Sequence, residues 1–239
     1  MGLLLPQTAS ATFHRHYGVY VAGTSQSSGG AQGTVVGWFR RSSFMTSSTG
    51  NRVWSKESGN ILRGKHLAFA NSAGAIRFLF SRATSNMIYS SSVEVFTDDK
   101  WRYVAVTWNT AAGAGLKSSL FLGNITGSVT HSPWSFTGEG TGSGQPDATS
   151  DYWVLFNTAI NGGSNGAAVA CEWVQMYNRE LTLGEIRTLQ FEPRPLDSGC
   201  VEYVYCTSPP QRMVPYSSSF FLSGTIAYDP SFPGPYQIM

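Results

Sequence analysis

The chain has 239 residues with a formal net charge of +2, and 13% of its residues are charged and 13% aromatic. This length fits one large all-β domain or two small ones, and the aromatic content excludes a disordered chain. Residues 1–117 hold 12 Lys/Arg and 4 Asp/Glu (+8), whereas the remainder holds 4 and 10 (−6). One interpretation is that residues 1–117 form a basic surface that binds an anionic partner or makes a head-to-tail contact with a second copy. The other is that strands from both halves of the chain interleave in the sandwich, so that basic and acidic residues are mixed on its surface.

Residues 1–33 predict an N-terminal arm or first strand that ends in a Gly/Ser-rich loop. The start lacks the basic residues and the long apolar core of a signal peptide, and Pro6 stands where a myristoylation motif requires Ser or Thr. No apolar run reaches the roughly 20 residues of a membrane span. We therefore expect a soluble protein made in a reducing cytoplasm, with no membrane partner and no glycosylation of the sequon at 124–126.

Short apolar stretches separated by Gly, Asn and Ser turns predict strands along most of the chain. The stretch 101–109 is apolar on both faces and rich in β-branched and aromatic residues, as expected for a strand inside a two-layer sandwich. A Gly/Ser/Pro-rich segment at 132–150 is predicted as a long loop. The predicted strands cover residues 34–40, 52–56, 66–71, 75–81, 89–96, 101–109, 118–123, 152–157 and 168–177.

One short helix is predicted over residues 181–190. Thr182 as N-cap and Glu185 three residues later form a capping box, and Leu181 and Ile186 can close a hydrophobic staple across it. The apolar stripe that would dock this helix on a sheet comprises Leu183, Ile186 and Leu189.

Beyond Phe191 the sequence becomes dense in Pro, Tyr and Phe. Proline at this density excludes a regular helix and a central strand, and the aromatic residues are not typical of a free linker. We interpret residues 191–239 as an extended C-terminal arm that packs either on its own domain or on a neighbouring molecule. The candidate contact residues of this assembly arm are Tyr216, Phe220, Phe221, Tyr228, Phe232 and Tyr236.

The three cysteines cannot all pair within one chain, and they have no metal-binding spacing. Cys171 lies in an apolar strand-like run and is predicted to be a small core residue. Cys200 and Cys206 either pair with each other or stay reduced. We predict no cofactor and no metal site.

Four segments in order, residues 35–41, 53–56, 99–108 and 171–181, resemble the laminin-G-like, concanavalin A-like jelly-roll family, in the variant common in phage and bacterial proteins. The resemblance covers residues 34–190 and implies an all-β, two-sheet antiparallel jelly-roll sandwich. The most specific part is a strand-to-helix pattern that matches here at Val174, Tyr177, Asn178, Arg179, Leu181, Thr182, Glu185 and Ile186.

Large aromatic residues in these segments are expected to be core residues, because buried rings on strands supply most of the buried area. They are Trp38, Trp101, Trp108 and Trp173. Asn178 and Arg179 are expected to fix the turn into the capped helix.

Several patterns that carry chemistry in other proteins are incomplete here. The pair at 98–99 has no third carboxylate for calcium, and Glu172 stands alone where a β-glucanase carries two further carboxylates. Ser164 lies in a G-x-S-x-G pattern followed by a strand rather than a helix, so we interpret it as a hairpin-loop residue. His14 and His16 lack a third metal ligand. We therefore predict that the protein is not an enzyme and does not bind nucleic acid.

A glycan site needs an exposed aromatic platform beside hydroxyl or amide donors. The candidates are Trp134, Phe136 and Trp153, although Trp134 could equally pin a loop to the sheet. Two functions follow. The resemblance favours a non-enzymatic structural protein of the virion, a phage decoration or minor capsid protein whose partners are other virion proteins or its own copies. The alternative is a lectin-like carbohydrate-binding module.

Overall fold

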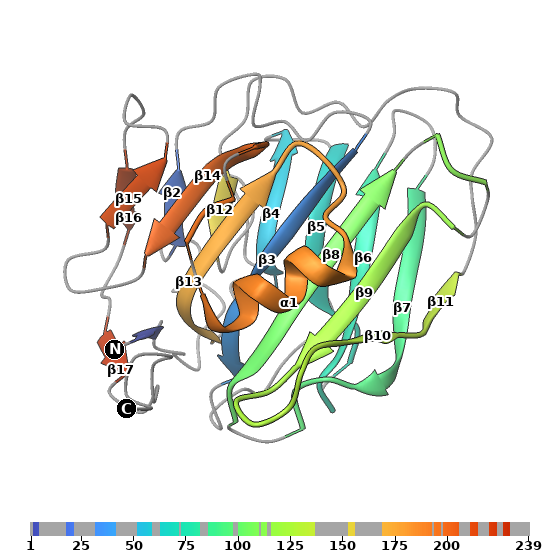
Figure 1. Cartoon of the computed structure of the whole chain (residues 1–239), viewed down its shortest axis with the longest axis horizontal. Coiled ribbons are helices and arrows are strands. Elements are labelled where there is room, and N and C mark those ends of the chain that lie inside the picture. The colour runs from blue at the N-terminus through green and yellow to red at the C-terminus, as the bar shows by residue number, and fades with distance from the viewer. Residues whose placement is uncertain are drawn as a thin grey trace.

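The computed structural model describes residues 2–4, 18–21, 32–41, 52–58, 63–71, 73–81, 86–97, 100–109, 111–113, 116–136, 153–155, 169–192, 194–196, 198–205, 211–214, 220–223 and 227–229. These residues form two sheets stacked face to face, and helix α1 (Leu183–Phe191) lies across the outer face of one of them (Figure 1). We call the sheet that carries α1 sheet A and the other sheet B. The predicted antiparallel jelly-roll sandwich is confirmed.

Sheet A has the strand order β10–β9–β8–β3–β13–β1–β17, and β14 and β15 continue it from β13. Each of its recorded strand pairs is antiparallel. The bounds are β1 Gly2–Leu4, β3 Gln32–Arg41, β8 Arg102–Asn109, β9 Ser118–Gly123, β10 Thr130–Ser132, β13 Val169–Tyr177, β14 Cys200–Tyr205, β15 Gln211–Val214 and β17 Ala227–Asp229.

Sheet B has the order β11–β7–β6–β5–β4–β12–β2–β16, and its recorded pairs are also antiparallel. The bounds are β2 Gly18–Val21, β4 Arg52–Ser58, β5 Arg63–Phe69, β6 Ala75–Ser81, β7 Asn86–Glu94, β11 Trp134–Phe136, β12 Trp153–Leu155 and β16 Phe220–Ser223. Within the described residues, no helix has the length and apolar character needed to span a membrane.

The strands of sheet A are apolar on both faces because each face packs against a separate core. On β3, Val35 and Phe39 point into the space between the sheets, whereas Val36 and Trp38 pack beneath α1. This alternation follows from the two-residue repeat of a strand. The sequence of a strand in a sheet that is covered on both faces is almost continuously apolar, which is why residues 101–109 were predictable as a buried strand.

The core between the sheets is dominated by aromatic rings. Trp54, Phe78 and Trp108 pack mutually, with ring centroids 5.6 to 6.5 Å apart, and none is more than 1% exposed. Truncating one such ring to alanine costs ~3–5 kcal/mol. The four tryptophans predicted as core residues are all buried, which confirms that prediction.

Helix α1 begins where the capping box predicts. The Thr182 side chain accepts a hydrogen bond from the Glu185 N–H, and the Glu185 carboxylate accepts one from the Thr182 N–H at 2.8 Å. Leu181, Ile186 and Leu189 are buried in the core under the helix. The helix is therefore fixed at its start by local bonds and along its length by burial against sheet A.

Two expectations are corrected by the structure. The segment 132–150, predicted as a loop, begins with the end of β10 and with β11, which pairs with β7 at the edge of sheet B. Proline density in 191–239 was expected to exclude a central strand, yet β14 lies between β13 and β15. Pro133 lies between β10 and β11, where no ladder hydrogen bond is lost, and β14 itself contains no proline.

Candidate functional site

A hollow of about 260 Å³ opens at the end of the sandwich where β7 and β9 finish and β8 and β10 begin. It receives residues from both sheets, and its floor is formed partly by Val95, which is buried, and Leu122, which is half-buried. The polar residues around it are Glu94, Arg102, Asn124, Ser128 and Thr130. We call this site the rim hollow.

The loop 124–129 forms one wall of the rim hollow. The Asn124 Oδ1 accepts hydrogen bonds from the N–H groups of Thr126 and Gly127 and from the Thr126 hydroxyl, at 2.6 to 3.1 Å. An Asn side chain that caps following N–H groups in this way defines a tight turn. With Oδ1 engaged, the amide Nδ2 of Asn124 is the group available as a donor to a ligand.

Gln190, near the end of α1, holds this loop from below. Its Nε2 donates to the carbonyls of Asn124 and Gly127 at 2.8 and 2.7 Å, and its Oε1 accepts from the Val129 N–H at 2.8 Å. The side chain is fully buried, so water does not compete with these three bonds. The buried amide of Gln190 therefore joins three residues of the loop to the helix.

The close approach of Gln190 requires glycine at position 123. A Cβ atom built on Gly123 would lie 2.8 Å from the Gln190 Nε2. Atoms this close overlap, so any larger residue displaces the amide from its loop partners.

Further hydrogen bonds fix α1, and through it Gln190, on sheet A. The Trp38 indole N–H donates to the Gln190 carbonyl at 3.1 Å, and the Tyr103 hydroxyl donates to the Ile186 carbonyl at 2.9 Å. Burial raises the pKa of Tyr103 well above its usual value, so this hydroxyl stays protonated and remains a donor. The two sheet-borne aromatics thus anchor the helix end that carries the loop.

Arg179 locks the turn before the helix, as the sequence predicted. Its guanidinium forms a bidentate pair with Glu185 at 2.7 and 3.1 Å, and its Nε donates to the Ser198 carbonyl. The hydrogen bonds from Arg179, ahead of those from Thr182, lower the pKa of Glu185 to about 2. Glu185 is therefore ionised at neutral pH and completes both the salt bridge and the capping box.

The rim hollow combines groups that suit polyhydroxylated ligands. Glu94 is an exposed acceptor, and Arg102 is half-buried, with its Nε donating to the Val95 carbonyl at 3.2 Å. Hydroxyls of Ser128 and Thr130 both donate and accept. Opposite charges and hydroxyls around an apolar floor can bind neighbouring hydroxyls of a sugar ring, whereas nothing here provides a nucleophile activated by a base.

The three predicted glycan residues do not lie together. Trp134 and Phe136 are on β11, but β12, with Trp153, is five strand positions away, or ~24 Å at the usual spacing of ~4.8 Å per strand. Trp134 stacks on Phe78 at 14° with centroids 6.5 Å apart, and Phe136 packs on Tyr89 at 5.1 Å. The two β11 rings are half-buried against the core, a geometry that favours a structural role in which they hold this segment on the sheet. Their role in glycan binding stays a prediction.

The assembly-arm candidates are only partly within the described residues. Phe220 and Phe221 lie on β16, which pairs with β2, and Tyr228 lies on β17, which pairs with β1. Tyr216, Phe232 and Tyr236 lie outside the described residues, as do His14, His16, Ser164 and the acidic pair at 98–99. The contacts predicted for this arm stay predictions.

Within the part of the chain that is described, no group of three or more His, Cys, Asp or Glu side chains could hold a metal ion. Cys171 is buried in the core and forms no disulfide, as expected for a small core residue. Cys200 is also a free thiol, and burial raises its pKa to about 11, so it is protonated and unreactive at neutral pH.

Neither the rim hollow nor Gln190 was predicted from the sequence. Glu94, Arg102 and Thr130 are isolated polar residues at strand ends, and Gln190 bonds to residues 61 to 66 positions away. The available sequence signals were indirect: the sequon at 124–126 contains the turn-forming Asn, and Gly123 ends an apolar strand, where glycine often marks close approach.

Comparison of the sequence with family models and with curated proteins gives no match. Among solved structures, a Bacteroides ovatus protein provisionally described as carbohydrate-binding superposes with a TM-score of 0.60 at 13% identity, covering 89% of this chain and 58% of that protein. This chain thus spans little more than half of that protein's length. An identity this low shows the fold alone.

Two further structures give lower TM-scores. The CBM40 domain of Ruminococcus gnavus IT-sialidase, bound to α2,3-sialyllactose, gives 0.44 at 16% identity, over 67% of this chain and 83% of the domain. Domains LG4-5 of mouse laminin α1 give 0.46 at 16% identity, over 82% of this chain and 44% of theirs. The TM-scores of these two structures are below 0.5, so the fold assignment rests on the antiparallel jelly-roll sandwich itself and on its superposition with the Bacteroides ovatus protein.

Proposed function

We propose that this protein is a non-catalytic carbohydrate-binding protein and that the rim hollow binds one sugar residue of its ligand. The observation that carries the proposal is the set of polar residues around the hollow, in which Glu94 and Arg102 face the same space as Asn124 and Thr130. Planar charged groups bind pairs of neighbouring hydroxyls with two hydrogen bonds each.

The size of the hollow supports the same assignment. Its volume of about 260 Å³ lies just below the range of ~300–1,000 Å³ that is typical of pockets for drug-sized molecules. A single ring with hydroxyls fits such a volume. The exposed walls leave room for the rest of a glycan to extend into solvent.

The fold supports the proposal by analogy, because carbohydrate binding is attributed to the Bacteroides ovatus protein that shares it. The structural virion role predicted from the sequence resemblance is favoured by no observation among the described residues. That role and a location in the virion stay predictions, and they are compatible with a surface module that binds host sugars.

The proposal is tested with a glycan array of mammalian, plant and bacterial glycans, followed by calorimetric titration of the glycans that bind. Glu94→Gln keeps the shape of the side chain but removes its charge. Hydrogen bonds to charged groups are worth ~1.5–3 kcal/mol, so we expect the affinity of this variant to fall about 10- to 100-fold.

Glu192→Gln is the matched control, because Glu192 is equally exposed but lies after α1, outside the rim hollow. It should bind like the wild type. Absence of binding to every glycan at millimolar concentration, or equal affinities of the wild type and Glu94→Gln, would contradict the proposal.

A further inference from the structure

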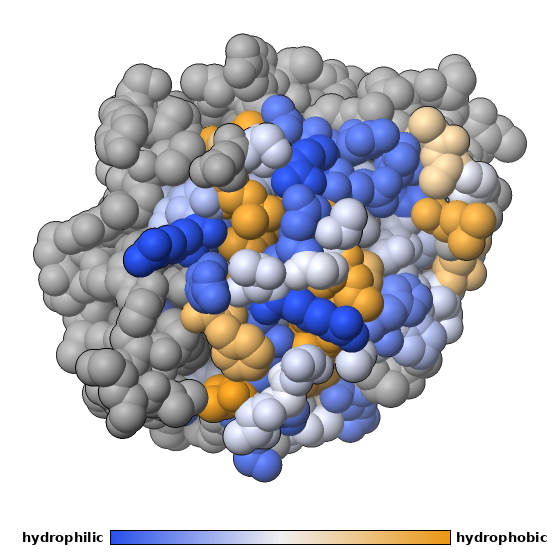
Figure 2. Space-filling view, in the orientation of Figure 1, coloured by the Kyte–Doolittle hydropathy of each residue, from blue (hydrophilic) through white to orange (hydrophobic). Residues whose placement is uncertain are grey.

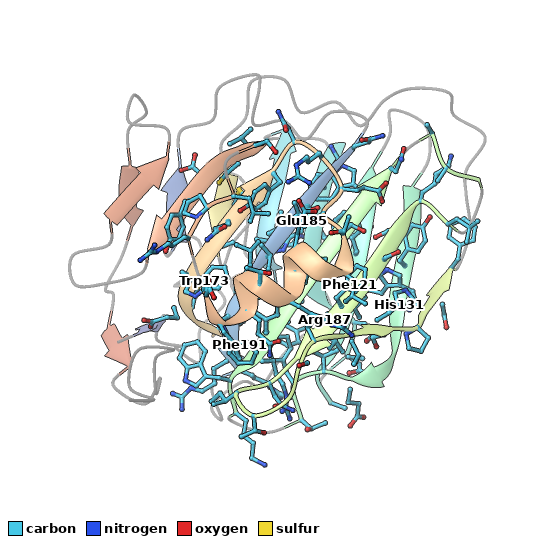
Figure 3. All side chains as sticks on the ribbon, viewed as in Figure 1. Phe121, His131, Trp173, Glu185, Arg187 and Phe191 are labelled. Carbon is cyan, nitrogen blue, oxygen red and sulfur yellow. The ribbon has the colours of Figure 1, made fainter. Side chains whose placement is uncertain are left out.

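A second group of exposed side chains lies on the other face of the same edge of sheet A. Phe121 on β9 and His131 on β10 are directly opposite in register, and their rings meet edge to face with centroids 5.4 Å apart. Arg187 of α1 lies beside them, with its Nε donating to the Val129 carbonyl at 3.2 Å (Figure 3). We call Phe121, His131 and Arg187 the outer platform.

The outer platform is accessible. His131 and Arg187 are exposed, and Phe121 is half-buried. Among the described residues, no carboxylate pairs with Arg187, and its Nε bond leaves the two terminal nitrogens as donors. The face of the molecule that carries α1 mixes hydrophilic residues with small hydrophobic patches, as a surface for an amphipathic ligand does (Figure 2).

The chemistry of the outer platform suits a sugar ring. One face of a pyranose carries C–H groups that pack on an aromatic ring, and its hydroxyls need donors at the rim. His131 and Phe121 supply the ring surface, and Arg187 supplies the donors. This is the combination of aromatic platform and polar neighbours that the sequence suggested for Trp134 and Phe136; here Phe121 is half-buried like those two rings, but His131 and Arg187 beside it are exposed.

The outer platform and the rim hollow are separated by the thickness of one strand. Leu122 on β9 and Thr130 on β10 line the hollow. Phe121, which precedes Leu122, and His131, which follows Thr130, point to the opposite face of the sheet. Strand β10 is the end of sheet A in the recorded order, and Thr130 and His131 are both exposed. A ligand can therefore pass around β10 from one site to the other.

We propose that the rim hollow and the outer platform are two subsites of one binding site, which takes an oligosaccharide wrapped around the edge strand β10 rather than a free monosaccharide. The inference rests on the proposed function of the rim hollow. A single sugar residue fills the hollow without reaching His131, so the platform contributes only when the ligand has two or more residues.

The experiment measures affinity against ligand length with the full chain. The probes are cello-, chito- and galacturonic acid oligomers of one to five residues, which are neutral, N-acetylated and acidic, together with any array glycan that binds and its shorter fragments. We expect at least a tenfold gain between the monosaccharide and the trisaccharide in one series.

In the variants His131→Ala and Arg187→Gln this gain should disappear. Monosaccharide affinity should stay unchanged in His131→Ala, whereas Arg187→Gln also loses its bond to the Val129 carbonyl of the loop and is judged by the length-dependent gain alone. Arg194→Gln is the matched control, because Arg194 is exposed but lies beyond α1.

The outcomes separate the two proposals. Affinity that does not depend on length, or a length-dependent gain that survives His131→Ala, overturns the two-subsite inference and leaves the rim hollow intact. Absence of binding at every length, for probes and array glycans alike, overturns both.

Discussion

Replacement of Gln190 by leucine directly tests its role in holding the loop 124–129, which we call the rim loop. Leucine is similar in size but cannot form the three hydrogen bonds to Asn124, Gly127 and Val129. The Val129 N–H is then left unpaired in a fully buried position, which costs ~1–3 kcal/mol. The two carbonyls lie in a more exposed loop where water can replace part of the loss, so each adds ~0.5–1 kcal/mol.

Together these losses destabilise the protein by about 3 kcal/mol, which corresponds to a fall in Tm of ~6–12 °C for a domain of this size. The matched control is Gln32→Leu, the same change at an exposed residue of β3, for which we expect a shift within ~0.5 kcal/mol. Urea unfolding and calorimetry measure both variants. Hydrogen exchange at the Val129 amide should also become faster in Gln190→Leu only.

The reasoning is refuted if Gln190→Leu unfolds within ~0.5 kcal/mol of Gln32→Leu and the Val129 amide stays equally protected. That result would mean that the loop holds its shape without the buried amide.

Two further predictions concern the same framework. Gly123→Ala should destabilise the protein and expose the rim loop, because the added Cβ would lie 2.8 Å from the Gln190 Nε2; wild-type protection in hydrogen exchange would argue against that overlap. Glu185 has its pKa lowered from 4.5 to about 2, so its pair with Arg179 stabilises the fold fully above pH 4.5 and progressively less as the pH falls towards 2. The Tm of Glu185→Gln should therefore be lower than that of the wild type at pH 6, and the two values should converge near pH 2. The control Glu192→Gln should follow the wild type across that range, and a constant difference between Glu185→Gln and wild type would contradict the assignment.

The sequence predicted those parts of the fold whose cause is local. The capping box needs only Thr182 and Glu185, three residues apart, and the structure places both as expected. The stretch 101–109 was recognisable because both faces of its strand are buried, so burial left an almost unbroken apolar run. The role of Arg179 was predictable for the same local reason, because its salt-bridge partner Glu185 is six residues away.

The sequence failed where pairing alone makes a strand. Strands β10 and β11 have three residues each and lie within a hydroxyl-rich stretch, so their composition does not differ from that of a loop. They become strands because β9 and β7 offer edges to them. Strand β14 was missed because proline density was judged over the whole tail, although Cys200–Tyr205 itself contains no proline.

The candidate site illustrates why binding is harder to predict than fold in this architecture. Gln190 sets the loop through bonds to residues 61 to 66 positions away, and no local pattern marks a glutamine for that role. By contrast Glu94, Ser128 and Thr130 are exposed around the hollow and take no part in the bonds from Gln190 that hold the loop. Substitutions at these three positions can therefore change the ligand with little cost in stability, whereas Gln190 and Gly123 must stay for the loop to keep its shape. In the proposed site, ligand preference and fold are thus assigned to separate residues, and the jelly-roll pattern of the sequence indicates the frame of the site but not its ligand.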